Sequence, residues 1–230
     1  MARSKIKSTI FVVDDDASVR VALARLLSSA GYAVEVFATA GEFLVRGQGR
    51  DTPGCVVLDI QMPGLSGLEL QRELKVFAPP IPIVFLSGHG DISTSVHAMK
   101  EGAVDFLIKP VDGESLLSVV GQAVARNVEA RERYAELREL QQRADTLTPQ
   151  EHKVMAMVVR GLMNKQVAGE LGIAEKTIKV HRARVIGKMR VDSLAELVRA
   201  AEKLGMFLNQ IPSGAARPVK TIVLPPPSSL

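Results

Sequence analysis

Hydrophobic and polar positions alternate in blocks along the first 125 residues. Short apolar runs rich in β-branched residues, each of strand length, occur at Thr9–Val13, Ala33–Phe37, Cys55–Leu58, Ile81–Leu86 and Val104–Ile108. Between them lie stretches with apolar residues at helical spacing, and the first of these is followed by Gly31, a typical helix stop. Five strands alternating with five helices predict an α/β domain, a doubly wound five-stranded parallel sheet with helices on both faces.

The pattern changes after residue 125. Residues 126–147 contain no Gly or Pro and carry a loose apolar stripe among Glu and Arg, formed by Val128, Tyr134, Leu137 and Leu140. We interpret residues 126–145 as a long helical linker that continues the fifth helix of the first domain outward. A solvated spacer and a dimerising coil both fit this pattern, although the heptads are too few to favour a coil.

From residue 146 the pattern predicts an all-α domain of four short helices, over residues 146–208. Thr148 is expected to cap the first helix, with Pro149 at its first position and Glu151 completing a capping box. The proline-rich residues 209–230 are expected to form a flexible tail.

The second and third of these short helices have the punctuation of a helix-turn-helix. Asn164 is expected to cap the second helix, Gly172 lies in the turn, and the third helix is expected over Glu175–Met189. In this motif the later helix enters the major groove of DNA. Ile178, Val185 and Met189 are expected to face the core.

Composition limits the class of protein. The chain is 47% hydrophobic and 23% charged, too apolar for a disordered protein. No apolar run is long enough for a membrane span, and the three aspartates after the first strand argue against a signal peptide. Cys55 is the single cysteine, which excludes an intrachain disulfide and a Cys-based zinc site and favours a reducing cytoplasm.

Charge is unevenly distributed. Residues 1–125 carry 11 basic and 14 acidic side chains, whereas residues 148–208 carry 11 basic and 6 acidic ones. Between Lys176 and Arg190 there are six basic residues and no acidic one. A basic helix can simply be a solvated face, but uncompensated charge on a helix-turn-helix favours DNA as the partner.

Polar residues follow the strands of the first domain. Asp14 and Asp15 come after the first strand, Asp59 after the third, Ser87 at the end of the fourth and Lys109 at the end of the fifth. Ligands bind at the carboxyl ends of parallel strands, so we expect these side chains to converge. Three carboxylates repel one another unless a cation binds, and hard oxygen ligands suit Mg²⁺. Together with Lys109 and the Ser87 hydroxyl, these carboxylates predict phosphoryl transfer in which a carboxylate is the nucleophile.

Each of these residues has an ordinary structural explanation when taken alone. An aspartate after a strand often caps the next helix, and this is the whole role expected of Asp16. A Lys-Pro pair such as Lys109–Pro110 is often a turn. Suitable residue types at four of the five strand ends together favour the functional interpretation.

The segments VVDDD, LDIQMPGLSGLEL, PIVFLSGHGD and GAVDFLIKP resemble the receiver domain of two-component response regulators, over residues 8–125. The resemblance implies a flavodoxin-like receiver in residues 1–125, in which Asp59 accepts a phosphoryl group from a sensor histidine kinase. It also implies a magnesium site, with Asp15, Asp59 and the backbone carbonyl of Gln61 as direct ligands and Asp14 acting through water.

The resemblance assigns roles to three further residues. Lys109 would pair with the phosphoryl oxygens, Ser87 would form a hydrogen bond with the phosphorylated side chain, and Phe106 would rotate inward behind it. Many relatives have Thr in place of Ser87 and Tyr in place of Phe106, and both changes are mild. The Lys109–Pro110 bond is usually cis in such domains. His89 either flanks the pocket or is an ordinary loop residue.

The segments LTPQE, GLMNKQVAGELGI and TIKVHRARVIGKM resemble the LuxR-type helix-turn-helix of the NarL/FixJ class, over residues 146–205. By this resemblance three residues face base edges: Lys179, Val180 and Ala183. Five more are candidates for phosphate or adjacent contacts: Asn164, Lys165, Thr177, Arg182 and Arg184. His181 is expected to pack within the domain.

The sequence departs from the usual LuxR-type pattern at three positions. Gln150 stands where Arg is common, Ala174 where a capping Ser is common, and Arg184 where Asn is common. The first two bear on stability, and the third bears on the contact assigned to Arg184.

Together the two resemblances imply a response regulator, in which phosphorylation of Asp59 controls sequence-specific DNA binding, and activation of transcription is the commoner outcome. Its partners would be the kinase, double-stranded DNA, RNA polymerase and, once phosphorylated, a second copy of the chain; no membrane is expected. One alternative is a DNA-binding regulator with a vestigial receiver, which the intact acidic set opposes. Another is a phosphatase or hydrolase with an Asp nucleophile, but the chain lacks a segment for a substrate, so we expect no enzyme.

Overall fold

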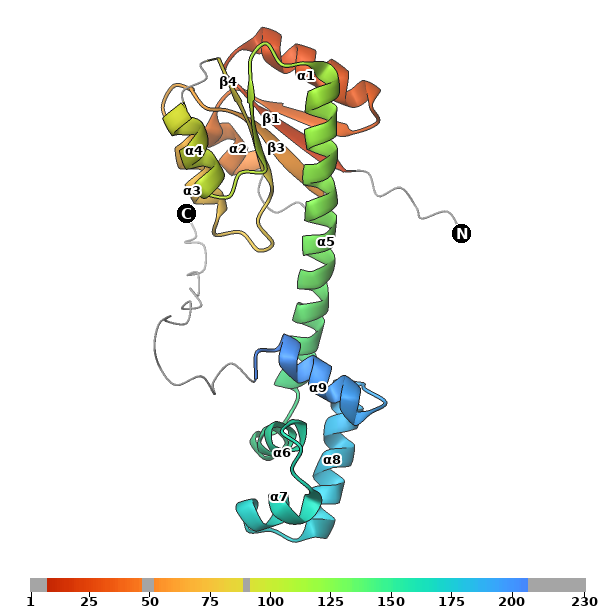
Figure 1. Ribbon diagram of the computed structural model, residues 1–230. Helices are drawn as coiled ribbons and strands as arrows, with labels where there is room; N and C mark the ends of the chain where they lie inside the picture. Colours follow the sequence, from red (N-terminus) through yellow and green to blue (C-terminus); the bar gives the residue numbers. More distant parts are fainter. Residues whose placement is uncertain (1–7, 47–51, 89–91, 207–230) are drawn as a thin grey trace, which may run out of the picture. The chain divides into compact units, whose positions relative to one another are not determined.

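The computed structural model describes residues 8–46, 52–88 and 92–206. The chain divides into two compact units, residues 1–136 and residues 137–230 (Figure 1). The expected tail at residues 209–230 and the candidate His89 lie outside the described residues. None of the helices within the described ranges is long and apolar enough to cross a membrane.

The first unit is built on a five-stranded parallel sheet. Its strands are β1 (Thr9–Val13), β2 (Ala33–Phe37), β3 (Gly54–Asp59), β4 (Ile83–Ser87) and β5 (Asp105–Ile108). They lie in the order β2-β1-β3-β4-β5, and every neighbouring pair is parallel. The predicted α/β fold is therefore confirmed.

The boundaries of β3, β4 and β5 differ from the prediction by one or two residues. β4 begins at Ile83 and not at Ile81, because Pro82 has no N–H to give to the ladder; its carbonyl accepts the Val56 N–H at 2.9 Å. β3 extends to Asp59, so this residue is the last of its strand and not the first after it.

Helices cover both faces of the sheet (Figure 1). The helices of this unit are α1 (Ala17–Ser29), α2 (Ala40–Arg46), α3 (Gly67–Leu74), α4 (Ile92–Lys100) and α5 (Gly113–Asp145). Alternate residues of β1 illustrate the division, since Ile10 and Val12 pack with α1 and α5, whereas Phe11 and Val13 pack with α2, α3 and α4. The sheet is thus buried on both faces, as its continuous apolar strands predict.

Two glycines allow close contacts between backbone segments at the two ends of β3. A Cβ atom on Gly67, the first residue of α3, would lie 2.3 Å from the Asp59 carbonyl oxygen. A Cβ atom on Gly54 would lie 2.0 Å from the Thr9 carbonyl oxygen. No real side chain tolerates such distances, so any larger residue would displace the strand that ends in Asp59.

α5 is a single helix of 33 residues, which runs through the predicted linker. Asn127 is buried in the first unit, where its side-chain oxygen accepts the Gly54 N–H at 3.1 Å and its amide donates to the Pro80 carbonyl at 3.4 Å. Leu140 and Ala144 are buried in the core of the second unit. The segment at 126–145 is therefore packed at both ends and is not a solvated spacer throughout.

The second unit contains α6 (Pro149–Val159), α7 (Asn164–Leu171), α8 (Glu175–Met189) and α9 (Leu194–Lys203). The predicted capping box of Thr148 and Glu151 is present, with Pro149 in the first turn. The predicted cap at Asn164 is wrong, because Met163 is the N-cap and Asn164 is the first helical residue. The Met163 N–H is held instead by the Gln166 side-chain oxygen, at 2.7 Å, so the cap is supplied from within the helix.

An ion pair between a buried glutamate and a partly exposed lysine joins α8 to the start of α6. Glu151 is only 2% exposed and accepts a hydrogen bond from Lys188 at 2.6 Å, and Lys188 also donates to the Thr146 carbonyl at 2.9 Å. The Glu151 carboxylate further accepts the Thr148 N–H at 2.8 Å. The bond from Lys188, followed by that from Thr148, lowers the pKa of Glu151 from 4.5 to about 2.

Replacing Glu151 with Gln is expected to flatten the acid dependence of the second unit's stability. Because the folded pKa is depressed, the stabilisation is complete above the ordinary pKa of 4.5 and is lost as the pH falls toward 2. Between about pH 5 and about pH 3 the urea midpoint should fall more in the wild type than in Glu151→Gln. Methyl NMR signals of the buried Met155 and Met189 report this unfolding in the full chain. Equal acid dependence in the two proteins would contradict the assignment.

Candidate functional site

Four polar residues of the predicted set lie at the carboxyl ends of the strands. Asp14 follows β1, Asp59 ends β3, Ser87 ends β4 and Lys109 follows β5. Asp14, Asp59 and Ser87 are only 1%, 5% and 3% exposed. Buried polar groups of this kind require partners, and Lys109 supplies one for both carboxylates.

The Lys109 ammonium group bridges the two aspartates. It donates to Asp14 Oδ2 at 2.7 Å and to Asp59 Oδ1 at 2.6 Å. The other Asp14 oxygen accepts the Asp16 N–H at 2.9 Å, which fixes the orientation of that carboxylate. The Lys109 N–H donates to the Ser87 carbonyl at 2.7 Å, and the Lys109–Pro110 bond is cis, as expected.

Burial and charge act in opposite directions at this site. Burial raises the pKa of Asp59, the nearby Asp14 charge adds to this, and Lys109 together with the Gln61 backbone N–H lowers it in part. Burial would lower the pKa of Lys109, but its hydrogen bonds to Asp14 and Asp59 outweigh burial and raise it. Lys109 is therefore a cation whose single positive charge is hydrogen-bonded to both carboxylates, Asp14 and Asp59.

The structure does not bring the third carboxylate to this point. Asp15 lies in the bend that follows β1 and is exposed. Within the described ranges, no three His, Cys, Asp or Glu side chains form a group that could hold a metal ion. The structure thus brings Asp14 and Asp59 together at Lys109, and the expected approach of Asp15 to them stays a prediction.

Sequence reasoning missed two residues that support the site. Arg20 of α1 donates to the backbone carbonyls of Asp14 at 2.7 Å and Asp15 at 2.9 Å, which holds the turn after β1. Gly67 lies directly against the Asp59 carbonyl. The glycines of LDIQMPGLSG were a usable signal for Gly67, whereas an arginine in the first turns of a helix gives no comparable signal.

Phe106 lies on β5 and is half-buried against the core on the α3–α4 side of the sheet. The neighbouring edge is apolar and open to solvent, with Ile108 of β5 56% exposed. Ile92, Val96 and Met99 of α4 are also exposed, at a spacing that places them along one side of the helix. α4 packs beside β5, and together they form what we call the α4–β5 surface.

In the second unit, α8 has a buried side and an exposed side. Ile178, Val185 and Met189 are fully buried, as predicted. Most of the candidate DNA contacts are exposed on α7 or α8: Lys165, Thr177, Lys179, Val180, Ala183 and Arg184. Lys179 lies 3.7 Å from Glu175, one turn away, and both side chains are largely in solvent.

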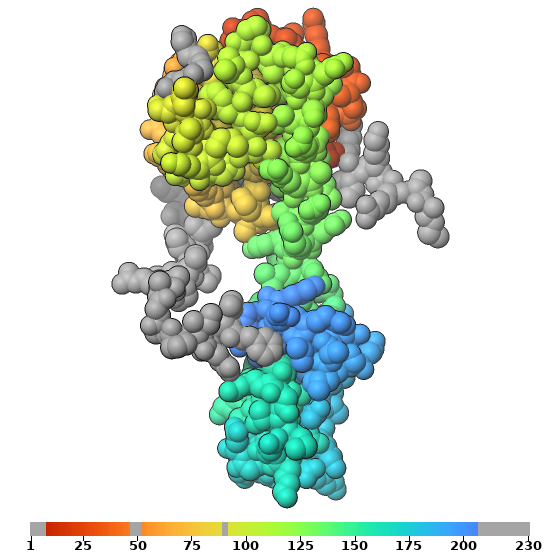
Figure 2. Space-filling model, viewed as in Figure 1, coloured from red at the N-terminus to blue at the C-terminus, as the bar shows by residue number. Residues whose placement is uncertain are grey.

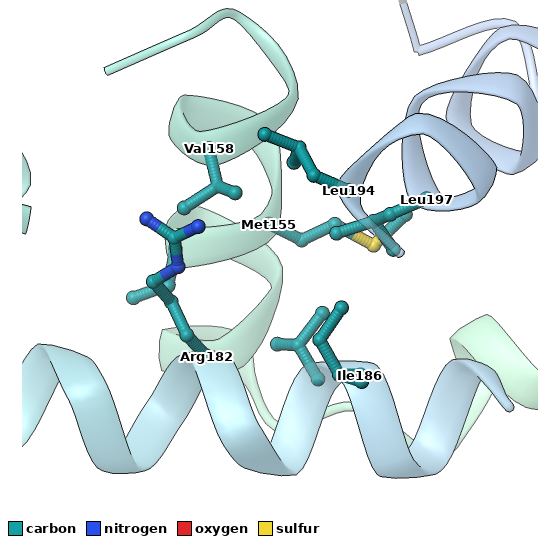
Figure 3. Close-up of a pocket in the computed structure, with 8 residues that line it drawn as sticks. Met155, Val158, Arg182, Ile186, Leu194 and Leu197 are labelled. Carbon is teal, nitrogen blue, oxygen red and sulfur yellow. The ribbon is translucent and has the colours of Figure 1, made fainter. Parts of the chain in front are cut away.

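Arg182 and Asn164 do not belong to this exposed set. Both are partly buried, and Arg182 Nη1 donates to Asn164 Oδ1 at 2.7 Å. Figure 3 shows the Arg182 side chain rising from α8 beside Val158 of α6. His181 is half-buried with its Nδ1 atom enclosed, in agreement with a packing role.

Known proteins match both units. A model of the response regulator receiver domain matches residues 10–121, and a model of bacterial regulatory proteins of the luxR family matches residues 145–201. Nodulation protein W of Bradyrhizobium diazoefficiens is 47% identical over 203 residues, which cover 88% of this chain and 89% of that protein. The transcriptional regulatory protein FixJ of the same organism is 43% identical over 201 residues, covering 87% and 98%.

A solved structure is also similar over most of the chain. The response regulator StyR has 49% sequence identity and a TM-score of 0.76, with 86% of this chain and 99% of that chain covered. A receiver domain implies a sensor kinase as partner, and a LuxR-type domain implies DNA binding; such proteins regulate transcription and are not enzymes. The chain therefore belongs to the two-component response regulators of the NarL/FixJ class, with a receiver domain followed by a LuxR-type DNA-binding domain.

Proposed function

We propose that a sensor histidine kinase phosphorylates Asp59 and that this controls how the chain binds DNA through α8. The observation that carries the proposal is the buried Asp59 carboxylate at the end of β3, held at 2.6 Å by Lys109. A carboxylate at a strand end with a cation beside it can act as a nucleophile toward phosphorus. The proposed site of action is the cytoplasm, where DNA is accessible.

The transfer step forms one bond and breaks another. A carboxylate oxygen of Asp59 attacks the phosphorus of a phosphohistidine, the P–N bond breaks, and the imidazole leaves with the bonding electrons. Lys109 then pairs with a phosphoryl oxygen, which carries the negative charge that the Asp59 carboxylate carried before. The Ser87 hydroxyl donates a hydrogen bond to another phosphoryl oxygen.

The chemistry of the donor set fits Mg²⁺. Asp14 and Asp59 place two carboxylates against one ammonium group, so the site keeps an excess of negative charge and hard oxygen atoms. Asp14, Asp15, Asp59 and the Gln61 carbonyl are the residues that would hold the ion. When bound, Mg²⁺ neutralises charge on the phosphoryl group in transfer. Arg20 supports this role by fixing the backbone of Asp14 and Asp15.

The signal leaves the receiver through the α4–β5 surface. Movement of Ser87 toward the phosphoryl group opens space for Phe106, which turns inward from its half-buried position. This change alters the α4–β5 surface, where Ile92, Val96 and Ile108 are exposed. Figure 2 shows α4, in yellow, on the outside of the first unit. We propose that a second phosphorylated copy of the chain covers these apolar side chains, because dimerisation removes them from water.

Pairing two chains brings two α8 helices to one DNA duplex. A single helix-turn-helix contacts few base pairs, and linking two raises the affinity through effective concentration. We propose that Lys179, Val180 and Ala183 meet base edges and that Lys165, Thr177 and Arg184 meet phosphates, since all six are exposed. On DNA the dimer would contact RNA polymerase and activate transcription. A vestigial receiver is disfavoured, because Asp14, Asp59 and Lys109 are joined in one site.

Replacing Asp59 with Asn is expected to abolish phosphorylation. Asn keeps the shape of the side chain but lacks the nucleophilic carboxylate, so incubation with radiolabelled acetyl phosphate and Mg²⁺ should label the wild type and leave Asp59→Asn unlabelled. A chelator should likewise prevent labelling of the wild type. Asp16→Asn is the matched control, because Asp16 caps α1 and should leave labelling intact. Labelling of Asp59→Asn at the wild-type level would remove Asp59 from this role.

Replacing Lys179 with Ala should relax sequence preference, whereas replacing Lys165 with Ala should weaken binding to all sequences. Loss of a base contact costs about 1–3 kcal/mol on the preferred duplex only. Loss of a phosphate contact reduces the slope of log affinity against log salt by about 0.9. Selection from a random duplex library, followed by salt titrations with the full chain, measures both. If neither variant changed the preferred sequence, Lys179 would not be a base contact.

A further inference from the structure

Arg182 faces away from the side of α8 that carries the other basic candidates. Lys179 and Arg184 are exposed, whereas Arg182 is partly buried and bonded to Asn164. Its side chain lines a small apolar pocket between α6, α8 and α9, together with Met155, Val158, Ile186 and Leu197 (Figure 3). Packing of the stem and bonding of the guanidinium group both hold this side chain inward.

The Arg182–Asn164 hydrogen bond is a second connection between α7 and α8, in addition to the turn that joins them in the chain. At the C-terminal end of α7 the chain turns at Gly172, with φ 66°, and enters α8 at Glu175. At the other end of α7, Asn164 is the first helical residue. It accepts the hydrogen bond from Arg182, which lies two turns into α8. The two helices are thus joined at both ends of α7, and the angle between them is fixed by a turn and a hydrogen bond.

No side-chain cap fixes the start of α7 independently. Met163 is the N-cap and makes no side-chain hydrogen bond to the helix, and the Gln166 contact is made within α7 itself. Among the hydrogen bonds of the described residues, the Arg182–Asn164 bond is therefore the one that connects the start of α7 to α8.

We propose that Arg182 is a positioning residue, which sets the angle of α8 through Asn164 and thereby determines how strongly the chain discriminates between DNA sequences. The inference rests on the proposed DNA-binding role of α8. It departs from the phosphate contacts that the LuxR-type resemblance implies for Arg182 and Asn164.

The two roles for Arg182 have different physical consequences. Sequence-independent binding depends on neutralised phosphates, and each lost contact lowers the salt slope. Reading of bases requires α8 to lie at the correct angle in the major groove. A positioning residue therefore affects the ratio of specific to non-specific affinity, and a phosphate contact affects both affinities alike.

The test compares Arg182→Met with Arg184→Met in the full chain. Met keeps the apolar stem of Arg182 and removes its donor groups. The probes are a duplex selected from a random library with the wild type and a shuffled duplex of the same composition, each titrated at several salt concentrations. Arg182→Met should lower affinity for the selected duplex roughly tenfold, leave the shuffled duplex nearly unchanged and keep the salt slope. Arg184→Met should weaken both duplexes and reduce the slope by about 0.9.

Variants of Asn164 establish that Arg182 acts through it. Asn164→Ala should lose the same discrimination, and the double variant Arg182→Met/Asn164→Ala should lose no more than either single variant. Asn164→Asp keeps an acceptor for Arg182 and should retain discrimination. Methyl NMR signals of Met155 and Met189 verify that the second unit stays folded in each variant.

Three results would overturn the proposal. A reduced salt slope with equal loss on both duplexes in Arg182→Met would make Arg182 a phosphate contact. Additive losses in the double variant would separate Arg182 from Asn164. Failure of the wild type to prefer any selected duplex over the shuffled one would reject the proposed function itself, and the inference with it.

Discussion

The receiver depends on one lysine placed between two buried carboxylates. Asp14 and Asp59 come from strands that are neighbours in the sheet, and both are almost fully buried, so their charges would oppose each other without Lys109. The sheet provides this arrangement, because its parallel strands all end at the same edge. A change of charge on Asp59 must therefore redistribute the bonds of Lys109, and Lys109 follows the strand that carries Phe106 and Ile108. We propose that chemistry at Asp59 alters the α4–β5 surface through this connection.

In the second unit a lysine bonded to a buried carboxylate fixes the position of a helix, α8. Lys188 of α8 is held by the buried Glu151 of α6, and Arg143 at the end of α5 donates to the Met189 carbonyl at 3.3 Å. The C-terminal part of α8 is thereby fixed to the helices around it, whereas its first three turns carry five of the six exposed candidate contacts. Arg182 lies at the end of the second turn, on the partly buried side of α8. The position of α8 thus depends on bonds made away from its exposed side.

Local patterns predicted most of the architecture. The apolar runs located the strands, the Thr148 capping box located the start of α6, and helical spacing identified Ile178, Val185 and Met189 as core. What the sequence could not show are contacts between distant residues. Asn127 is buried against a strand 73 residues away, and Arg182 is held inward by Asn164. Each of these depends on tertiary packing, which residue type and spacing do not determine.

The central claim is that a charge change at Asp59 and Lys109 is converted into pairing of two chains through the α4–β5 surface. Sedimentation velocity of the full chain, with and without beryllofluoride and Mg²⁺ as a phosphoryl mimic, tests it most directly. Val96→Asp places a charge on that surface and leaves Asp14, Asp59 and Lys109 unchanged. The wild type should change from monomer to dimer when the mimic is added, and Val96→Asp should remain a monomer. A wild type that stays monomeric with the mimic bound, or a Val96→Asp variant that dimerises as the wild type does, would contradict the account.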